Sequence, residues 1–136
     1  KIISFNKFHK IQIYSYKNKL DNSINFAITK GKLNPNKAIP VRVLSTQIKK
    51  KNITDNIEIK KYLNFLSKYK NFLLLIINKN KKLDFNNINT LRYYGIGAQI
   101  IKDLKVKNMI LISRRRKKII ALEGFGLKIK KQIIIK

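Results

Sequence analysis

Alternation of apolar and polar residues predicts a β-hairpin near the start of the chain. Residues 11–16 and 24–29 each alternate in this way, as strands with one buried face do. The turn-forming residues 18–23 join the two strands. A loop that contains glycine and both prolines is expected over residues 31–40, and residues 41–45 are expected to form a third strand.

The period of the pattern becomes helical after this third strand. Apolar residues recur at spacings of three and four positions over residues 59–66, which predicts a helix over residues 56–69. Asp55 stands three residues before Glu58, which is the spacing of a capping box, so Asp55 is expected to begin the helix. An unbroken apolar run at residues 72–77 follows and is typical of a strand buried on both faces.

The second half of the chain alternates between helix-like and strand-like segments. After a polar surface loop at 79–82 and 86–89, the expected order is helix, strand, short helix and strand, over residues 96–104, 109–112, 117–122 and 127–135. Right-handed crossovers between such strands predict a mostly parallel sheet with helices on its faces. With the antiparallel hairpin, the expectation is a mixed α/β fold in a single domain over residues 1–136.

Length and composition are those of one basic globular domain. The 136 residues and the apolar fraction of 44% are sufficient for a buried core. The formal net charge is +26, and a field of this sign attracts polyanions such as nucleic acid and phosphorylated metabolites. A genome rich in A and T would produce the same excess of Lys, Ile and Asn. We favour that explanation because the lysines are spread over the whole chain.

The side chains needed for thiolate chemistry or a catalytic triad are missing. The chain has no cysteine, which excludes disulfides and thiolate-bound zinc. Its one histidine, His9, has no evident Ser or Asp partner, so we expect neither a metal nor a cofactor. No apolar run is long enough to cross a bilayer and no secretory signal is evident, so we expect a cytoplasmic protein without a membrane partner.

Two segments carry candidate binding chemistry. Residues 95–98 are expected to open the second helix, where free backbone N–H groups favour a phosphate, although close packing of the helix on the sheet explains the same small residues. Arg92, just before them, has the geometry to clamp a phosphate. The basic residues 114–118 follow a predicted parallel strand, where α/β proteins bind ligands. They suit a polyphosphate or RNA backbone, and a solvated charge run explains them equally well.

Several segments together resemble the GTP cyclohydrolase II family, whose members open the guanine ring of GTP. Residues 90–99 read T-L-R-Y-Y-G-I-G-A-Q, which is similar to the family's D-L-R-D-Y-G-I-G-A-Q. Residues 122–127 read L-E-G-F-G-L, which is similar to its L-x-G-Y-G-L. Upstream, V-R-V-L-S at residues 41–45 is similar to the family's V-R-V-H-S strand. The resemblance covers most of the chain and implies the family's α/β fold.

Carried over by position, the resemblance implies three site residues. Arg92 matches the family's arginine that is proposed as nucleophile on the GTP phosphate. Ser113 and Lys118 match its substrate-contacting threonine and lysine. Thr90 replaces the family's general-base aspartate, and the region of its zinc cysteines is shortened here to residues 47–57 without a thiol. Since zinc makes the hydroxide that attacks the ring, we expect no ring opening.

Three functions from different classes follow from these observations. We favour a degenerate, non-catalytic domain of a riboflavin-biosynthesis protein, structural or dimerising, beside an upstream dihydroxybutanone-phosphate synthase domain. The start at Lys1 rather than Met fits a C-terminal piece of such a fusion. The alternatives are an active GTP cyclohydrolase II and a basic RNA- or polyphosphate-binding domain. The expected partners are GTP or another phosphorylated metabolite, a second copy of the chain as a homodimer, and nucleic acid through bulk positive charge.

Overall fold

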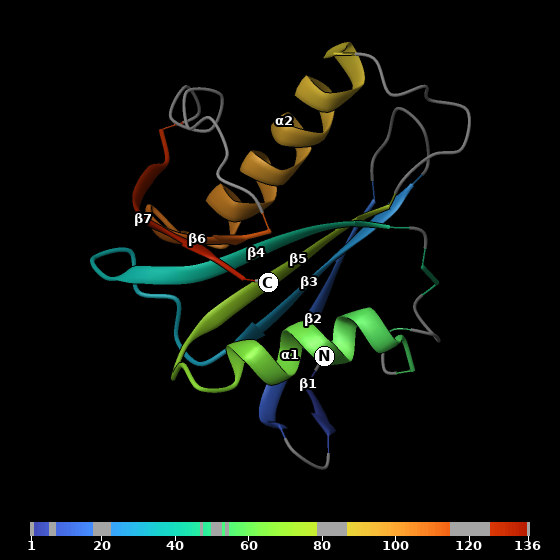
Figure 1. The fold of residues 1–136 in the computed structure, drawn as a ribbon, viewed down its shortest axis with the longest axis vertical. Helices are drawn as coiled ribbons and strands as arrows, with labels where there is room; N and C mark the ends of the chain where they lie inside the picture. Colours follow the sequence, from blue (N-terminus) through green and yellow to red (C-terminus); the bar gives the residue numbers. More distant parts are fainter. Residues whose placement is uncertain are drawn as a thin grey trace.

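A computed structural model of the chain contains one sheet with a helix on each face (Figure 1). It describes residues 2–5, 8–17, 23–46, 48–49, 53, 55–78, 87–114 and 126–135. The strands are β1 (Ile2–Phe5), β2 (Phe8–Lys17), β3 (Ile24–Lys30), β4 (Ala38–Thr46), β5 (Phe72–Asn78), β6 (Asn108–Ser113) and β7 (Lys128–Ile134). The helices are α1 (Ile57–Leu66) and α2 (Asn87–Asp103).

The seven strands are ordered β1-β2-β3-β5-β4-β6-β7 across the sheet. Neighbours from β1 to β5 in this order pair antiparallel, and the pair of β2 and β3 is the predicted hairpin. From β5 onward β4, β6 and β7 pair in parallel, with Val43 opposite Leu75 and Arg42 opposite Ile112. The predicted fold class, a mixed α/β sheet with helices on its faces and an N-terminal antiparallel hairpin, is confirmed. The sheet was predicted to be mostly parallel, and three of the six pairings between the described strands are parallel.

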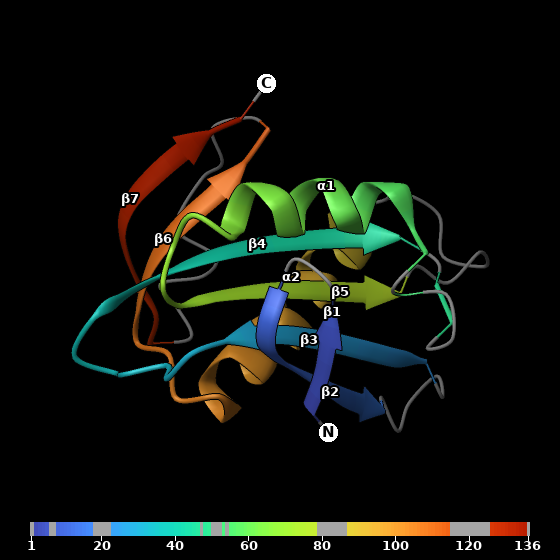
Figure 2. The same cartoon turned by 90° about the horizontal axis from the view of Figure 1, so that it is seen from below.

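Strand β5 lies inside the sheet and is covered on both sides, which explains its unbroken apolar run. Phe72, Leu74 and Ile76 belong to the hydrophobic core under α1. The alternate residues of β5 belong to the core under α2. Figure 2 shows the two helices on opposite faces of the sheet, as side chains that alternate along a strand require.

Helix α1 begins one residue later than the capping-box spacing predicts. Its N-cap is Asn56, whose side-chain oxygen accepts a hydrogen bond from the Ile59 backbone N–H at 3.0 Å. Asp55 is therefore not the cap. Asn56 offers an equally good acceptor at the adjacent position and already accepts the hydrogen bond from the Ile59 N–H group, which has no partner within the helix. The helix ends at Leu66, and Ser67 donates its backbone N–H to the Leu63 carbonyl.

Two loops end earlier in the structure than the sequence predicted. The loop predicted over residues 31–40 overlaps β4, which begins at Ala38. Pro40 pairs with Ile110 of β6, whereas pairing with β5 begins only at Val41, so at Pro40 only one side of the strand has a ladder partner. The loop predicted over residues 86–89 overlaps the first turn of α2, which begins at Asn87. The predicted helix at 117–122 lies outside the described residues.

The expectation that residues 95–98 open a helix is wrong. Helix α2 begins at Asn87, so these residues lie in its interior and their backbone N–H groups belong to the helix. A Cβ atom on Gly97 would lie 3.2 Å from Ile77 Cδ1 and 3.4 Å from Leu75 Cδ2. Close packing of α2 on β5, not a phosphate at a helix start, is therefore the reason for the small residue.

Candidate functional site

A buried tyrosine between two arginines is the most polar part of the core under α1. Tyr62, on α1, is 1% exposed. Its hydroxyl oxygen accepts a hydrogen bond from Arg42 Nη2 at 3.1 Å and another from Arg114 Nε at 3.1 Å. Arg42 comes from β4, and Arg114 directly follows β6. The arrangement thus ties α1 to two strands of the parallel part of the sheet.

Cations also approach the faces of the Tyr62 ring. The Arg42 guanidinium carbon lies 4.5 Å from the ring centroid, and Lys61 Nζ lies 5.9 Å from it. Both distances are in the range of cation–π attraction. We call these four residues, Arg42, Lys61, Tyr62 and Arg114, the Tyr62 cluster.

The electrostatics of the Tyr62 cluster favour the anionic form of the phenol. Burial alone raises the pKa of Tyr62, but the hydrogen bonds and positive charge of Arg42, and then of Arg114, outweigh it and hold the pKa below its usual value. Arg42 is 8% exposed, and its Nε has no hydrogen-bond partner among the described residues. The second nitrogen of its fork, Nη1, donates to the Val43 carbonyl at 2.7 Å.

A second polar pair lies on the opposite face of the sheet. The Tyr16 hydroxyl, at the end of β2, donates to Asp103 Oδ2 on α2 at 2.8 Å. Burial, followed by the hydrogen bond and the negative charge of Asp103, raises the pKa of Tyr16 well above its usual range. A cavity of about 420 Å³ adjoins the pair and is lined also by Lys17, Asn25 and Gln99 together with apolar residues of α2.

Asparagine side chains occupy the carboxyl end of β5. The Asn78 backbone N–H donates to Asn25 Oδ1 at 2.9 Å, and Asn78 Oδ1 accepts from the Ile48 backbone N–H at 2.7 Å. Asn78 Nδ2 also donates to the Ile24 carbonyl. This is the edge at which α/β proteins bind ligands. Here its amide groups join β5 to the start of β3 and to the segment after β4.

The structure brings together only some of the residues that the sequence singled out. Ser113 ends β6 and is 1% exposed, with Arg114 next to it in the Tyr62 cluster. Arg92 lies in the first half of α2, but its side chain is outside the described part of the structure. Lys118 and the remaining basic residues at 115–117 also lie outside it. The three predicted site residues therefore stay predictions.

Sequence reasoning missed the Tyr62 cluster, although one signal pointed to it. Arg42 stands two residues from Leu44 in a predicted strand, so the two side chains share a face. Leu44 belongs to the core under α1. An arginine at an inward strand position needs a buried partner, and the hydroxyl of Tyr62 on the inner face of the predicted helix could have been considered as that partner.

The residues present do not fit the zinc that the family resemblance implies. The chain has no cysteine to supply thiolate ligands. In the ranges that the structure describes, no three His, Cys, Asp or Glu side chains gather in a way that could hold a metal ion. Among the same ranges, no helix is both long enough and apolar enough to cross a membrane.

Comparison with known proteins identifies the family. The sequence model of GTP cyclohydrolase II matches residues 56–134. The riboflavin biosynthesis protein RibBA of Aquifex aeolicus (strain VF5) is 47% identical over 60 residues, which cover 44% of this chain and 14% of that protein. RibBA of Bacillus subtilis (strain 168) is 46% identical over 57 residues, covering 42% and 14%. This chain therefore matches only a small part of the length of these relatives.

A solved structure has the same fold over almost the whole chain. RibBX of A. baumannii, a two-domain 3,4-dihydroxy-2-butanone 4-phosphate synthase, superposes with a TM-score of 0.68 at 23% identity. The match covers 99% of this chain and 39% of RibBX, and at this identity it establishes the fold alone. The family model, in contrast, matches more than half of the sequence. The chain belongs to the GTP cyclohydrolase II family.

Proposed function

We propose that this chain is a GTP cyclohydrolase II-like domain of a riboflavin-biosynthesis protein, with a structural or dimerising role and no ring-opening activity. The observation that carries the proposal is the absence of cysteine from a chain whose family resemblance implies thiolate-bound zinc. Without those ligands the domain has no means of generating the hydroxide that ring opening needs.

The relatives support the pathway. The RibBA proteins that match this chain are riboflavin biosynthesis proteins. RibBX, which has a domain of the same fold, is a two-domain dihydroxybutanone-phosphate synthase. We infer by analogy that this chain accompanies an upstream synthase domain in the cytoplasm, and that the synthase domain performs the chemistry of the whole protein.

Side-chain bonding at the strand ends supports a scaffold role. The Asn25 side chain accepts a hydrogen bond from the Asn78 backbone N–H. Arg42 and Arg114 both donate hydrogen bonds to the Tyr62 hydroxyl. These polar groups stabilise the fold through interior bonds. Thr90 at the position of the family's general base also lacks the carboxylate that proton transfer would use.

Product analysis of the full-length protein tests the proposal. We would supply GTP and ribulose phosphate together, follow both products by chromatography, and measure bound zinc by mass spectrometry. A zinc-dependent GTP cyclohydrolase II and a dihydroxybutanone-phosphate synthase, assayed in parallel, are the positive controls for the two assays. The expected result is turnover of ribulose phosphate, unchanged GTP and far less than one zinc per chain. Zinc at one per chain together with GTP turnover would overturn the proposal in favour of an active cyclohydrolase.

A polyphosphate- or RNA-binding role is the second candidate. It is favoured by the position of Arg114, which follows the carboxyl end of β6 at the edge where parallel sheets bind ligands. Arg115→Ala with Arg116→Ala should then weaken RNA binding far more than Lys130→Ala with Lys131→Ala on β7. Equal losses in the two double variants would indicate attraction by bulk charge alone.

A further inference from the structure

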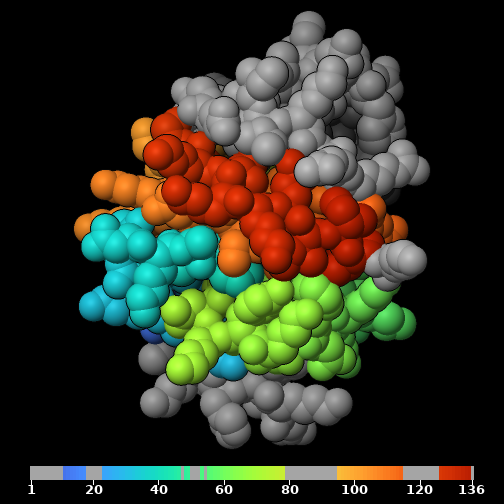
Figure 3. Space-filling model, turned by 60° about the vertical axis from the view of Figure 1, so that its left-hand side comes forward, coloured from blue at the N-terminus to red at the C-terminus, as the bar shows by residue number. Residues whose placement is uncertain are grey.

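A cavity separates α1 from the carboxyl end of β7. Its volume is about 360 Å³, which is within the range of small-molecule pockets. It is lined by Lys61, Tyr62, Phe65, Ile134 and Ile135. Figure 3 shows α1 in green and β7 in red next to each other on this face of the molecule. None of the five lining residues falls within the motifs that resemble the family.

The walls of this α1–β7 cavity are mostly apolar. Phe65 and Ile135 pack against the core under α1, and Ile134 is 46% exposed. An exposed isoleucine beside an aromatic ring is a surface that gains from being covered by an apolar group. The cavity therefore favours a ligand with an aromatic or branched apolar body.

Within the described ranges, the cations around the cavity have no acidic partner. Tyr62 is contacted by Arg42, Lys61 and Arg114, and the polar contacts of these cations in the described part of the chain go to the phenol and the Val43 carbonyl. Asp103, the carboxylate that bonds a tyrosine, lies on the α2 side at Tyr16. Lys61 and Arg114 are exposed and Arg42 is buried, so a negative group in the cavity would be attracted by two solvent-facing cations and by the buried one behind them.

Among the described residues, the Tyr62 hydroxyl accepts two hydrogen bonds and shows no acceptor for its own hydrogen. Its oxygen accepts from two guanidinium groups, and a phenol has two acceptor positions and one hydrogen. The neutral phenol therefore has its hydrogen left for a third partner. Since Tyr62 lines the cavity, an anionic acceptor placed there would complete its hydrogen bonding.

We propose that the α1–β7 cavity binds a small organic anion, which consists of an aromatic or branched apolar body with one phosphate or carboxylate group. The apolar body lies against Phe65 and Ile134, and the anionic group lies by Lys61 and Tyr62, with Arg114 behind the phenol. The proposal does not depend on the proposed function, because none of the residues that line the cavity lies in a segment that resembles a family motif.

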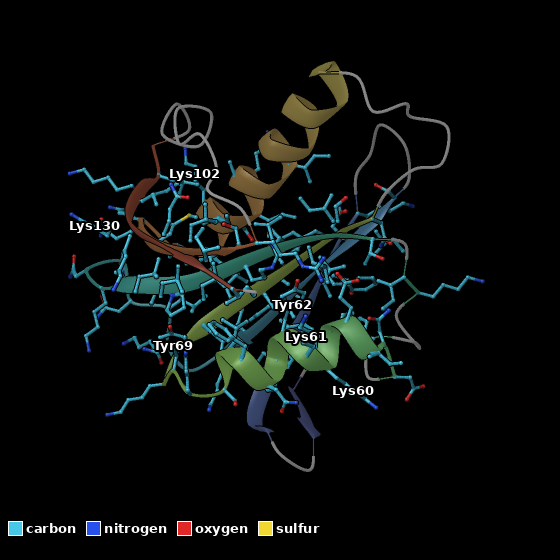
Figure 4. The ribbon with its side chains drawn as sticks, in the orientation of Figure 1. Lys60, Lys61, Tyr62, Tyr69, Lys102 and Lys130 are labelled. Atoms are coloured by element: carbon cyan, nitrogen blue, oxygen red, sulfur yellow. The ribbon has the colours of Figure 1, made fainter. Side chains whose placement is uncertain are left out.

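Helix α1 offers a matched pair of lysines for the test. Lys60 and Lys61 are adjacent and both exposed. Lys61 lines the cavity, whereas Lys60 does not, and Figure 4 shows Lys60 at the outer side of the helix. Lys61→Gln and Lys60→Gln therefore remove the same charge from the same helix, but only the first removes it from the cavity.

Titration of the whole chain with phenyl phosphate, followed by calorimetry and by the isoleucine methyl signals in NMR spectra, tests the proposal. The expected result is saturable binding that shifts the methyl signals of Ile134 and Ile135. Inorganic phosphate and benzyl alcohol, which carry the charge and the ring separately, should each bind at least about tenfold more weakly. Equal binding of inorganic phosphate, or no saturable binding of phenyl phosphate, would refute the proposal.

The two lysine variants decide between the cavity and bulk charge. Lys61→Gln should weaken phenyl phosphate binding about fivefold or more, as expected for loss of one charged contact of about 1 kcal/mol. Lys60→Gln should leave the affinity unchanged, and circular dichroism should show that both variants are folded. If the two variants lose affinity equally, the anion is held by net charge and the assignment of the cavity is wrong.

Discussion

At the scale of single residues, Tyr62 has two functions in the core. Its ring fills the space under α1, and its hydroxyl bonds the guanidinium groups of Arg42 and Arg114. A buried arginine is tolerated when its N–H groups have acceptors, and the phenol supplies one such acceptor. The Tyr62 hydroxyl oxygen therefore contributes hydrogen bonds that join α1 to β4 and to the end of β6.

Tyr62→Phe should lower the free energy of unfolding by about 1–3 kcal/mol, because it leaves donors of a buried arginine without an acceptor. Urea denaturation measures the loss. Tyr69→Phe, which keeps a ring on the partly buried end of the same segment, is the control and should stay within about 0.5 kcal/mol of wild type. The double variant Arg42→Met with Tyr62→Phe should lose less free energy of unfolding than the sum of the losses in the two single variants. Wild-type stability of Tyr62→Phe would contradict this role.

The two perturbed tyrosines should affect stability at alkaline pH with opposite signs. The pKa of Tyr62 is lowered on folding, so its ionisation stabilises the fold fully above about pH 10, the unfolded value, and this contribution is lost as pH falls through the folded pKa. The pKa of Tyr16 is raised, so its contribution is present below about pH 10 and is lost as pH rises further.

Urea unfolding of wild type, Tyr62→Phe and Tyr16→Phe between about pH 7 and about pH 11 checks these signs, and comparison of each variant with wild type cancels the titration that all three proteins share. The stability advantage of wild type over Tyr62→Phe should grow as pH rises toward the unfolded tyrosine value. The advantage over Tyr16→Phe should shrink once that value is passed. An advantage over Tyr62→Phe that does not change with pH would show that the phenol stays neutral.

At the scale of elements, the ends of helices and strands are set by individual hydrogen bonds. Asn56 rather than Asp55 caps α1, and Asn78 joins the end of β5 to neighbouring backbone. Both are short polar side chains that bond backbone groups left without partners where a regular element ends.

Asn56→Ala should destabilise the protein by about 1 kcal/mol, since it removes the acceptor for the Ile59 N–H group. Asn56→Asp keeps an acceptor at the same place and should be close to wild type. Thermal or urea unfolding of these variants and of Asp55→Ala gives the comparison. A larger loss in Asp55→Ala than in Asn56→Ala would restore the capping box predicted from the sequence.

At the scale of the whole molecule, net charge acts against the fold. A charge of +26 on 136 residues produces self-repulsion in the compact state. The structure counters it with two hydrophobic cores, one on each face of the sheet, and with lysines whose heads reach solvent or rest on aromatic rings. Stability should therefore depend on ionic strength.

Raising NaCl from about 0.01 M to about 0.15 M should raise the midpoint of thermal unfolding by several degrees, because the screening length falls from about 30 Å to about 8 Å. Differential scanning calorimetry gives the midpoint, and NaCl and KCl at equal ionic strength should give the same rise. A midpoint that is unchanged or falls would mean that the charges are too far apart to repel.

The sequence by itself determined the types of the elements and the class of the fold, because hydrophobic periodicity reports local geometry. It also determined the family, through motifs within short segments. Only the tertiary structure decided the strand order, the position of residues 95–98 inside α2 and the partners of Arg42. These depend on contacts between segments far apart in the chain, such as β4 with α1 and the end of β6, and no local pattern specifies which buried phenol an arginine will meet.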